Sequence, residues 1–430
     1  MAGIYRTNGT PTSDQKGTLS FWLKGNNPSL GTDGYIFSFW NDASNWGKLC
    51  LNSTQTIEYT NYDSGSLNVN LWAGPRKFRD PSAWWNVVLA MDTTQSTPAD
   101  RAKIYINGVQ ETTLTQTTYP ALNYQLVQFL VSGTQVTIGS KYDGSSYSSI
   151  YTGCMSHVQF VDGLQLAPTE FGEFDSTSGI WKIKTTPYAT PGTNGFCLKM
   201  EDRTNLDLDS SSNAHTFTTT GDVTPTYDNP SNNFCTSTPI VSNSNTSGKA
   251  TLTNGNLTQT VIGTSQTNWG YPSSMGVTKG KWYMEYEMGS TADNVALGII
   301  SDTGLSVGDP DSPSANTTVR GPGLTTTDYG LSWGYWATNG QYYTNASGTA
   351  YGDSFTTAGD IIGCAFDADT GKLYFSKNGT WQNSGDPAAG TNPMVTITME
   401  DGVSYFFHST GYSDDNWDVN FGNGYFGTTV

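Results

Sequence analysis

The residues that most often carry acid–base chemistry are scarce in this sequence. It contains three histidines, at His157, His215 and His408. His157 falls inside GCMSHVQF, a pattern that predicts a strand and favours a packed or rim histidine over a catalytic base. The sequence has no GxSxG motif, so a serine hydrolase of that type would lack the turn that exposes its nucleophile. We therefore predict no catalytic residue among the histidines.

Two groups of carboxylates could in principle cleave a glycosidic bond. Glu170, Glu173 and Asp175 come near the E-x-D-x-x-E strand of laminarinase-type glycosidases, but the final glutamate is missing and PTEFGEF begins like a helical turn. Glu285 and Glu287 share a strand face in YMEYEM, which is more often the solvated face of a strand. We predict that the protein is not an enzyme, and a glycan-cleaving activity remains the third alternative.

Acidic clusters raise the question of a metal ion. Asp202, Asp207 and Asp209 lie close in sequence, as do Asp367 and Asp369. Neither group has the spacing of a calcium-binding loop, and turn formation by Asp explains both. We predict no metal site and no cofactor, and the binding of a calcium ion stays an open alternative.

Aromatic residues are the remaining candidates for a site. Five of them crowd the stretch LSWGYWATNGQYY: Trp333, Tyr335, Trp336, Tyr342 and Tyr343. Aromatic rings stack on sugars and anchor protein interfaces. We predict a ligand-binding role for this group, with packing in the core as the alternative for most of its members.

Composition and charge limit the possible functions. A length of 430 residues predicts two or three domains, and only 13% of the residues are charged, with Gly 48, Tyr 24 and Trp 13. This composition is typical of turn-rich all-β proteins. The net charge of −17 disfavours nucleic acid and anionic membranes as partners, and no apolar run is long enough for membrane insertion. Five widely separated cysteines and the lack of an apolar signal core favour synthesis in a reducing cytoplasm.

One stretch organises the second half of the chain, GDIIGCAFDADTGKLYFSKNGTW at 359–381. It predicts an apolar strand, a turn with Gly371 at positive φ, a return strand and a second tight turn at Asn378-Gly379. WNVVLAMD and KIYING, at 85–92 and 103–108, follow the same order. Two distant hairpins of this kind predict two β-rich domains.

A polar stretch separates the two sets of strands. Residues 222–233 and 237–248 are rich in Pro, Asn and Ser, which predicts a linker with little buried surface. We therefore predict domains at 1–225 and 251–430 joined by a linker at 226–250.

The first half resembles the LamG or concanavalin-like jelly-roll domain. The resemblance rests on GTLSFWLKG, WWNVVLAMDTT, AKIYINGVQ, VTIGS and GCMSHVQFVDGLQLAPTEFGEFD, in that order. It is closest to a form found in structural proteins of tailed bacteriophages, in which the domain ends much as 171–213 do here.

The second half resembles a SPRY domain, a β-sandwich. GKWYMEYE, NVALGII, GDIIGCAFDADTGKLYFSKNG and VNFG carry this resemblance. Together the two resemblances imply a fold of two β-sandwiches and a virion protein of a bacteriophage. Its partners would be other virion proteins in a homo-oligomeric arrangement and a host surface glycan or receptor. We expect an exposed fibre, spike or appendage component, and a capsid or tail decoration protein is the alternative.

Overall fold

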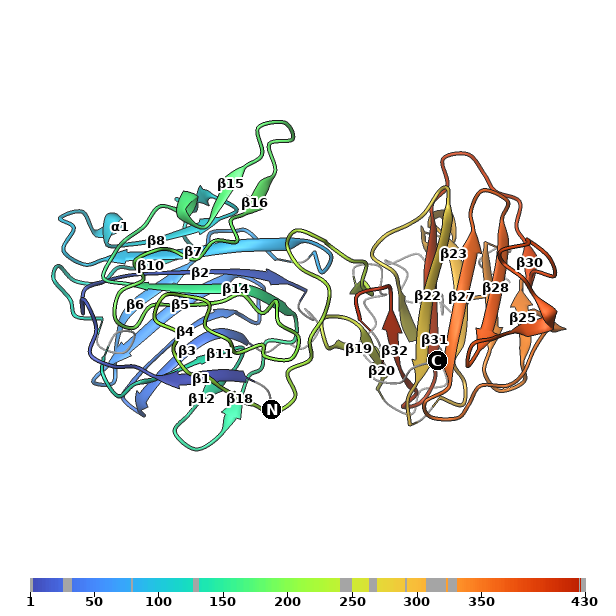
Figure 1. Ribbon diagram of the computed structural model, residues 1–430, viewed down its shortest axis with the longest axis horizontal. Coiled ribbons are helices and arrows are strands. Elements are labelled where there is room, and N and C mark those ends of the chain that lie inside the picture. Colours follow the sequence, from blue (N-terminus) through green and yellow to red (C-terminus); the bar gives the residue numbers. More distant parts are fainter. Residues whose placement is uncertain are drawn as a thin grey trace. The chain divides into compact units, whose positions relative to one another are not determined.

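The computed structural model describes residues 3–25, 33–78, 80–126, 131–239, 250–262, 269–290, 292–306, 322–323, 331–424 and 426. The chain divides into two compact units, Met1–Asn233 and Phe234–Val430. Almost all of the described secondary structure is antiparallel β-strand (Figure 1). The predicted all-β fold is confirmed.

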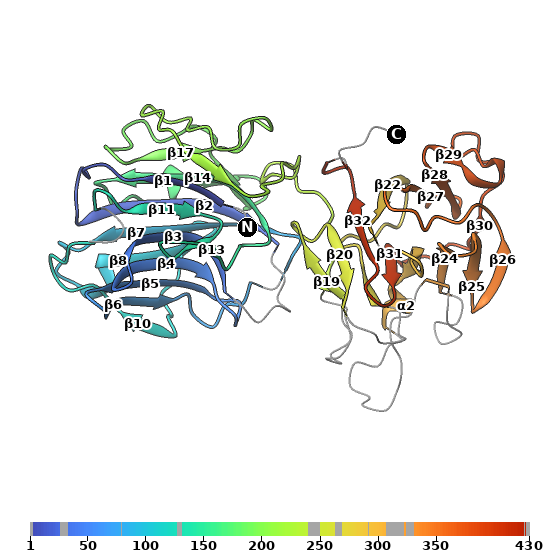
Figure 2. The same ribbon diagram turned by 90° about the horizontal axis from the view of Figure 1, so that it is seen from below.

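Two sheets form the first unit. Its eight-stranded sheet has the order β10 (Gln116–Thr118), β6 (Ser66–Trp72), β5 (Ile57–Asp63), β4 (Asn45–Leu51), β3 (Gly34–Asp42), β11 (Gln135–Ile138), β1 (Gly3–Thr7) and β18 (Thr218–Thr220). Its six-stranded sheet has the order β17 (Phe196–Leu198), β14 (Cys154–Asp162), β2 (Lys16–Lys24), β7 (Trp84–Asp92), β8 (Ala102–Ile106) and β9 (Val109–Gln110). The strands of one sheet lie over those of the other (Figure 2). One buried apolar cluster takes side chains from both sheets, so the unit is a β-sandwich.

Shorter elements complete the first unit. They are α1 (Pro98–Arg101), the 3₁₀ turn η2 (Pro168–Glu170), and the strand pairs β12 (Lys141–Tyr142) with β13 (Tyr147–Ser148) and β15 (Gly172–Phe174) with β16 (Trp181–Ile183). The helical turn that the sequence predicted at the start of PTEFGEF is η2.

The second unit repeats the two-sheet plan. Its eight-stranded sheet runs β19 (Ala250–Thr253), β20 (Thr258–Val261), β32 (Asn416–Asn420), β22 (Lys281–Met288), β27 (Ile361–Asp367), β28 (Lys372–Lys377) and β29 (Thr380–Trp381), with β30 (Val395–Thr396) also paired to β28. Its six-stranded sheet runs β21 (Trp269–Pro272), β31 (Tyr405–Gly411), β23 (Ala296–Ser301), β24 (Ser332–Trp336), β25 (Gln341–Thr344) and β26 (Ser347–Ala350). The helices are α2 (Asp302–Ser306) and the 3₁₀ turn η4 (Gln382–Ser384). A second buried apolar cluster takes side chains from both of these sheets.

The predicted central hairpin is β27 and β28. Asp367 pairs with Lys372 across the turn, and its carboxylate accepts the backbone N–H groups of Asp369 and Thr370 at 3.0 and 3.2 Å. Gly371 has φ of 70°, as the sequence predicted. A short side chain that accepts local N–H groups and a glycine in the left-handed region together fix the turn.

We predict that Gly371→Val destabilises the second unit more than Gly402→Val does. Both glycines have positive φ, 70° and 82°, so both substitutions carry a backbone strain of about 1–3 kcal/mol. A Cβ on Gly371 would also come 1.9 Å from the carbonyl oxygen of Ile397, whereas no atom lies within 4 Å of one on Gly402. Equal denaturation midpoints for the two variants would contradict this account of the turn.

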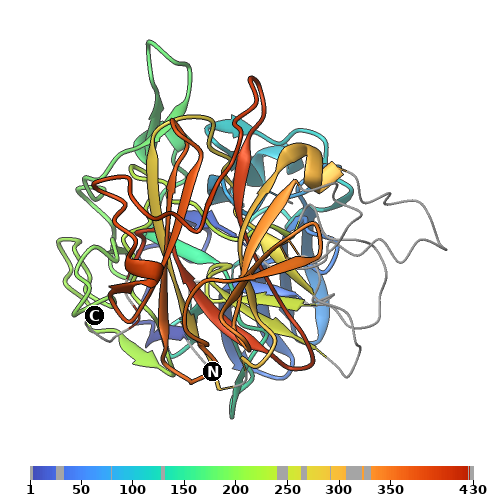
Figure 3. The same cartoon turned by 90° about the vertical axis from the view of Figure 1, so that its right-hand side faces the viewer.

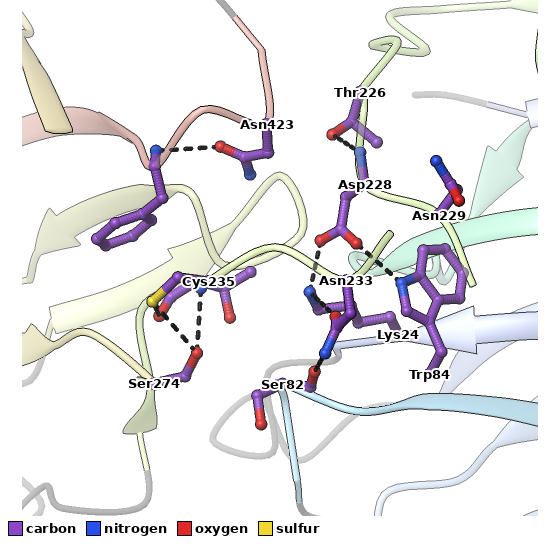
Figure 4. Close-up of polar contacts among 12 residues, drawn as sticks. Lys24, Ser82, Trp84, Thr226, Asp228, Asn229, Asn233, Cys235, Ser274 and Asn423 are labelled. Atoms are coloured by element: carbon purple, nitrogen blue, oxygen red, sulfur yellow. Dashed lines mark hydrogen bonds and ion pairs between the residues drawn. The ribbon is translucent and has the colours of Figure 1, made fainter. Parts of the chain in front are cut away.

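The described part of the expected linker differs from the prediction. Asp228 is buried, and its carboxylate forms an ion pair with Lys24 at the end of β2 while accepting the indole N–H of Trp84 at 2.8 Å (Figure 4). Lys24 also donates to the Asn233 side chain at 2.6 Å, and Asn233 donates to the carbonyl of Ser82 at 2.8 Å. The side chains of Lys24 and Asp228 are 1% and 0% exposed. Asp228 and Asn233 therefore attach this part of the chain to the first unit, which extends to Asn233, because a buried lysine requires its counter-charge there.

Residues 240–249 of the expected linker lie outside the described residues, and β19 begins at Ala250. The five cysteines are free thiols, and burial raises the pKa of Cys197 to about 12. Within the described ranges, no helix is long and apolar enough to cross a membrane.

Candidate binding surface

His157 sits at a β-bulge in β14, where the register with β2 shifts between Ser156 and Gln159. Its φ is 48°, a strained value for a residue other than glycine. The Ser156 hydroxyl lies 2.8 Å from Nδ1, and a Glu201 carboxylate oxygen lies 3.4 Å from Nε2. Burial lowers the pKa of His157 to about 4. Serine, histidine and carboxylate thus meet, but Ser156 and His157 are 5% and 4% exposed, which leaves a substrate no access to the hydroxyl.

The other two histidines lie on different elements. His408 is fully buried on β31, and burial lowers its pKa to about 4. His215 follows Asp209, which accepts its backbone N–H at 2.8 Å, and burial also lowers the pKa of the His215 ring. Neither forms the base–nucleophile pair that acid–base catalysis needs.

The acidic clusters serve local turns. Asp209 accepts the backbone N–H groups of Cys197 and Ser211, both at 2.9 Å, and Asp202 accepts that of Thr204 at 2.9 Å. Asp207 accepts the hydroxyl of Thr219 at 2.8 Å. In the part of the chain that the structure describes, no three His, Cys, Asp or Glu side chains come together as metal ligands.

The five aromatic residues predicted as one ligand site face two different ways. Tyr335 is 0% exposed and packs inside the second sandwich against Tyr351, Phe355 and Phe375. Trp333 shares its strand face and packs against the core beside Tyr405, with the ring centroids 6.3 Å apart.

Tyr342 is directly opposite Tyr335 on β25 and also packs against the core. The prediction of a ligand-binding role is therefore wrong for Tyr335. Trp333 and Tyr342 are partly buried core residues. The reason is the two-residue period of a strand, which sends alternate side chains to opposite faces of the sheet.

Trp336 and Tyr343 remain together on the outer face of the six-stranded sheet. Their ring centroids are 5.5 Å apart with an interplanar angle of 53°, and both residues are half-buried. The Tyr343 hydroxyl donates to Gln341 Oε1 at 3.0 Å and accepts from Asn339 Nδ2 at 3.0 Å. Thr338 accepts the indole N–H of Trp336 at 2.9 Å. We call these five residues the Trp336 surface.

The Trp336 surface combines ring faces with amide and hydroxyl groups. Such a combination can bind a sugar, because a ring stacks on the apolar face of the sugar while amides exchange hydrogen bonds with its hydroxyls. The neighbouring edge strand β26 is exposed along its whole length. It contains no general acid–base pair, and the chemistry that it supports is binding.

Three members of the Trp336 surface were not predicted: Thr338, Asn339 and Gln341. A signal for two of them exists in the sequence. Asn339, Gln341 and Tyr343 alternate in NGQYY, and alternation places residues on one face of a strand.

Comparisons with known proteins match parts of the chain. The sequence model of the SPRY domain family matches residues 281–392, from the start of β22 to a point just beyond η4. A 68-residue stretch is 37% identical to the dual specificity protein kinase splA of Dictyostelium discoideum. That stretch is 14% of this chain, and the chain spans only 3% of the kinase.

Solved structures give a weak overall similarity. The SPRY domain of human HERC1 has a TM-score of 0.27 at 18% identity, over 39% of this chain and 89% of that one. Another human SPRY domain has a TM-score of 0.28 at 20% identity, over 39% and 93%. The heptameric SAP-like pentraxin of Limulus polyphemus has a TM-score of 0.29 at 19% identity, over 38% and 71%. The family match, with the central hairpin and the Trp336 surface inside it, identifies residues 281–392 as a SPRY domain.

Proposed function

We propose that the chain is a structural protein of a bacteriophage virion, in which a LamG-like sandwich and a SPRY sandwich serve binding rather than catalysis. In this proposal it is an exposed fibre, spike or appendage component that attaches to a glycan or protein on the host surface. Its other partners are virion proteins, and it assembles as a homo-oligomer on the particle surface.

The Trp336 surface is the observation that carries the binding part of this proposal, and the virion part rests on the sequence resemblances of the two halves. It presents two aromatic rings beside three polar side chains, on a sheet whose edge is exposed. SPRY domains are protein-interaction domains and generally non-catalytic, which supports a binding role for the second unit. The net charge of −17 supports neutral or positively charged ligands over nucleic acid.

We expect Trp336→Ala to weaken retention of the full-length protein on bacterial surface polysaccharide by about 1–3 kcal/mol, the loss typical of a central aromatic anchor. An array of such polysaccharides provides the measurement, and an assay for new reducing ends on the same array should stay negative. Trp46→Ala is the matched control, because Trp46 stacks on Tyr62 across β4 and β5 of the first unit at 4.5 Å.

Equal retention of the two variants would contradict a glycan site at Trp336. Polysaccharide cleavage by the wild-type protein that is lost in Glu173→Gln or Glu285→Gln would show instead that the protein is a glycan-cleaving enzyme.

A second candidate function, a capsid or tail decoration protein, is favoured by the β15–β16 hairpin. The loop that joins the two strands of this hairpin projects beyond both sheets of the first unit (Figures 1 and 3). Phe174 and Ile180 near its tip are 52% and 64% exposed. Trp181, which pairs with Phe174, holds the hairpin to the sheet below, because its ring is buried and its indole N–H donates to Asn86 of β7 at 3.0 Å. A rigid projection with apolar side chains suits attachment to another subunit.

The decoration role predicts that Phe174→Ser with Ile180→Ser abolishes binding to particles that lack the protein, while the fold survives. Electron microscopy of the particles would show what fraction of the attachment positions the variant protein fills. Full occupancy by this variant would exclude the hairpin as the attachment site.

A further inference from the structure

The eight-stranded sheet of the second unit has an outer face that the proposed function does not use. Tyr283 on β22 is 52% exposed there, and its ring lies against Trp381 of β29 with centroids 6.3 Å apart at 68°. Glu285 is half-buried beside them. This face belongs to a different sheet from the Trp336 surface.

Glu285 is held in place beside the rings. Its two carboxylate oxygens accept the Tyr283 hydroxyl at 3.0 Å and the Asn420 side-chain amide at 3.2 Å. A Cβ at Gly363, the residue opposite Glu285 on β27, would come 2.5 Å from the Tyr283 hydroxyl. A side chain at this position would push the Tyr283 hydroxyl away from its present place over the sheet, so Gly363 helps to position the ring beside the carboxylate.

Two more carboxylates continue this face. Glu287 and Asp418 are paired residues on the adjacent strands β22 and β32, and both are half-buried. Burial raises the pKa of Glu287, with a further contribution from the charge of Asp418, and burial also raises the pKa of Asp418. A positive charge close to these two carboxylates would favour their ionised forms.

Two other carboxylates, at the end of β27 and just before its start, form ion pairs with lysines. Asp367 lies 3.8 Å from the Lys281 ammonium, and Asp360 lies 3.2 Å from that of Lys377. Among the described residues, no cationic side chain forms an ion pair with Glu285, Glu287 or Asp418. Three carboxylates without an ion pair in the described residues thus lie next to the Tyr283 and Trp381 rings on one sheet face.

We propose that Tyr283, Trp381, Glu285, Glu287 and Asp418 bind a basic segment of a partner protein. A lysine or arginine of that segment lies against the Tyr283 and Trp381 rings and forms an ion pair with Glu285. A second cationic side chain neutralises Glu287 and Asp418. Aromatic faces attract cations, and carboxylates strengthen that attraction with charge-assisted hydrogen bonds.

The layout of the face favours a peptide over a small ion. Its members come from β22, β29 and β32, and neighbouring strands in a sheet are separated by about 4.8 Å. Two cationic groups on one flexible chain can reach both carboxylate positions at once, which a single small cation cannot do. A neutral glycan could donate hydroxyl groups to these carboxylates but would bring no positive charge to compensate them.

The test measures the anisotropy of a fluorescent hexalysine and a fluorescent hexa-arginine peptide with the full-length protein, at about 0.15 M salt. We expect binding to both peptides. Glu285→Gln with Glu287→Gln should weaken it at least about tenfold, the loss expected when a close charge pair is removed. Tyr283→Ala should also weaken it, whereas Tyr283→Phe, which keeps the ring, should retain most of it.

Glu400→Gln is the charge control, because Glu400 is exposed in the same unit but is not part of this face. Equal weakening by Glu400→Gln and by the Glu285/Glu287 pair would overturn the proposal, since the net charge of the chain would then explain the binding. Spermidine that binds as tightly as the peptides would overturn the peptide as occupant. Unchanged thermal midpoints of the variants exclude unfolding as the cause of lost binding.

Discussion

Asp228→Ala is expected to destabilise the first unit by about 3–5 kcal/mol, because it leaves the Lys24 ammonium buried without its counter-charge. The side chains of the pair are 1% and 0% exposed, so solvent cannot replace the lost carboxylate. Trp84 loses the acceptor of its indole N–H at the same time. Denaturant unfolding of the full-length protein measures the loss, and only the transition that reports on the first unit should move.

The matched control for this prediction removes both charges. Lys24→Met combined with Asp228→Leu should recover most of the loss, since well-packed apolar residues often replace a buried ion pair at little cost. The stability that this double variant does not recover comes from Trp84 and Asn233, because each of them loses a hydrogen bond. A loss below about 1 kcal/mol for Asp228→Ala would show that Lys24 reaches water in the native state.

The same ion pair bears on where the first unit ends. A fragment of residues 1–225 lacks Asp228 and Asn233, so it should be less stable than a fragment of residues 1–233 by a similar amount. Equal stability of the two fragments would support the boundary at 225 that the sequence predicted.

Local signals explain what the sequence could predict. The hairpin of β27 and β28 is encoded by adjacent residues, namely an apolar run, Asp367, Gly371 and a return strand. Turn chemistry of this kind acts over a few positions and needs no knowledge of the tertiary structure. The family match confirms the SPRY resemblance at 281–392, while the LamG and phage resemblances stay predictions.

Long-range contacts explain what the sequence could not show. Asp228 lies in a stretch whose composition favours a linker, and its partner Lys24 is 204 positions away in the chain. The strand β4 was not predicted, because Lys48 interrupts its apolar pattern. Lys48 forms ion pairs with Asp33 at 2.7 Å and with Glu58 of β5 at 2.9 Å, and these pairs allow its burial.

The five aromatics predicted as one candidate site are divided between the two faces of the sheet. A turn separates β24 from β25, and side chains alternate between the two faces along each strand. These two features divide the five aromatics into two groups. Trp333 and Tyr335 are two residues apart and share a face, whereas Trp336 follows Tyr335 directly and points the other way. The sequence alone could not show which of the two faces is covered by a second sheet.

Tyr335→Ala should therefore destabilise the second unit by about 3–5 kcal/mol, as removal of a buried aromatic ring does in other cores. The Tyr335 ring lies 4.8 Å from that of Phe355 and 5.3 Å from that of Phe375 in a fully buried position. Its hydroxyl donates to the carbonyl of Asp353, so Tyr335→Phe should cost about 1 kcal/mol by itself.

Trp336→Ala is the decisive comparison, because it changes the next residue in the chain. Its ring is half-buried on the outer face, and we expect a stability loss of less than about 1 kcal/mol with a clear loss of ligand retention. Unfolding in denaturant and retention on polysaccharide, measured on both variants, separate the two roles. If Trp336→Ala unfolded the second unit as readily as Tyr335→Ala, the Trp336 surface would be part of the core and the proposed binding site would be lost.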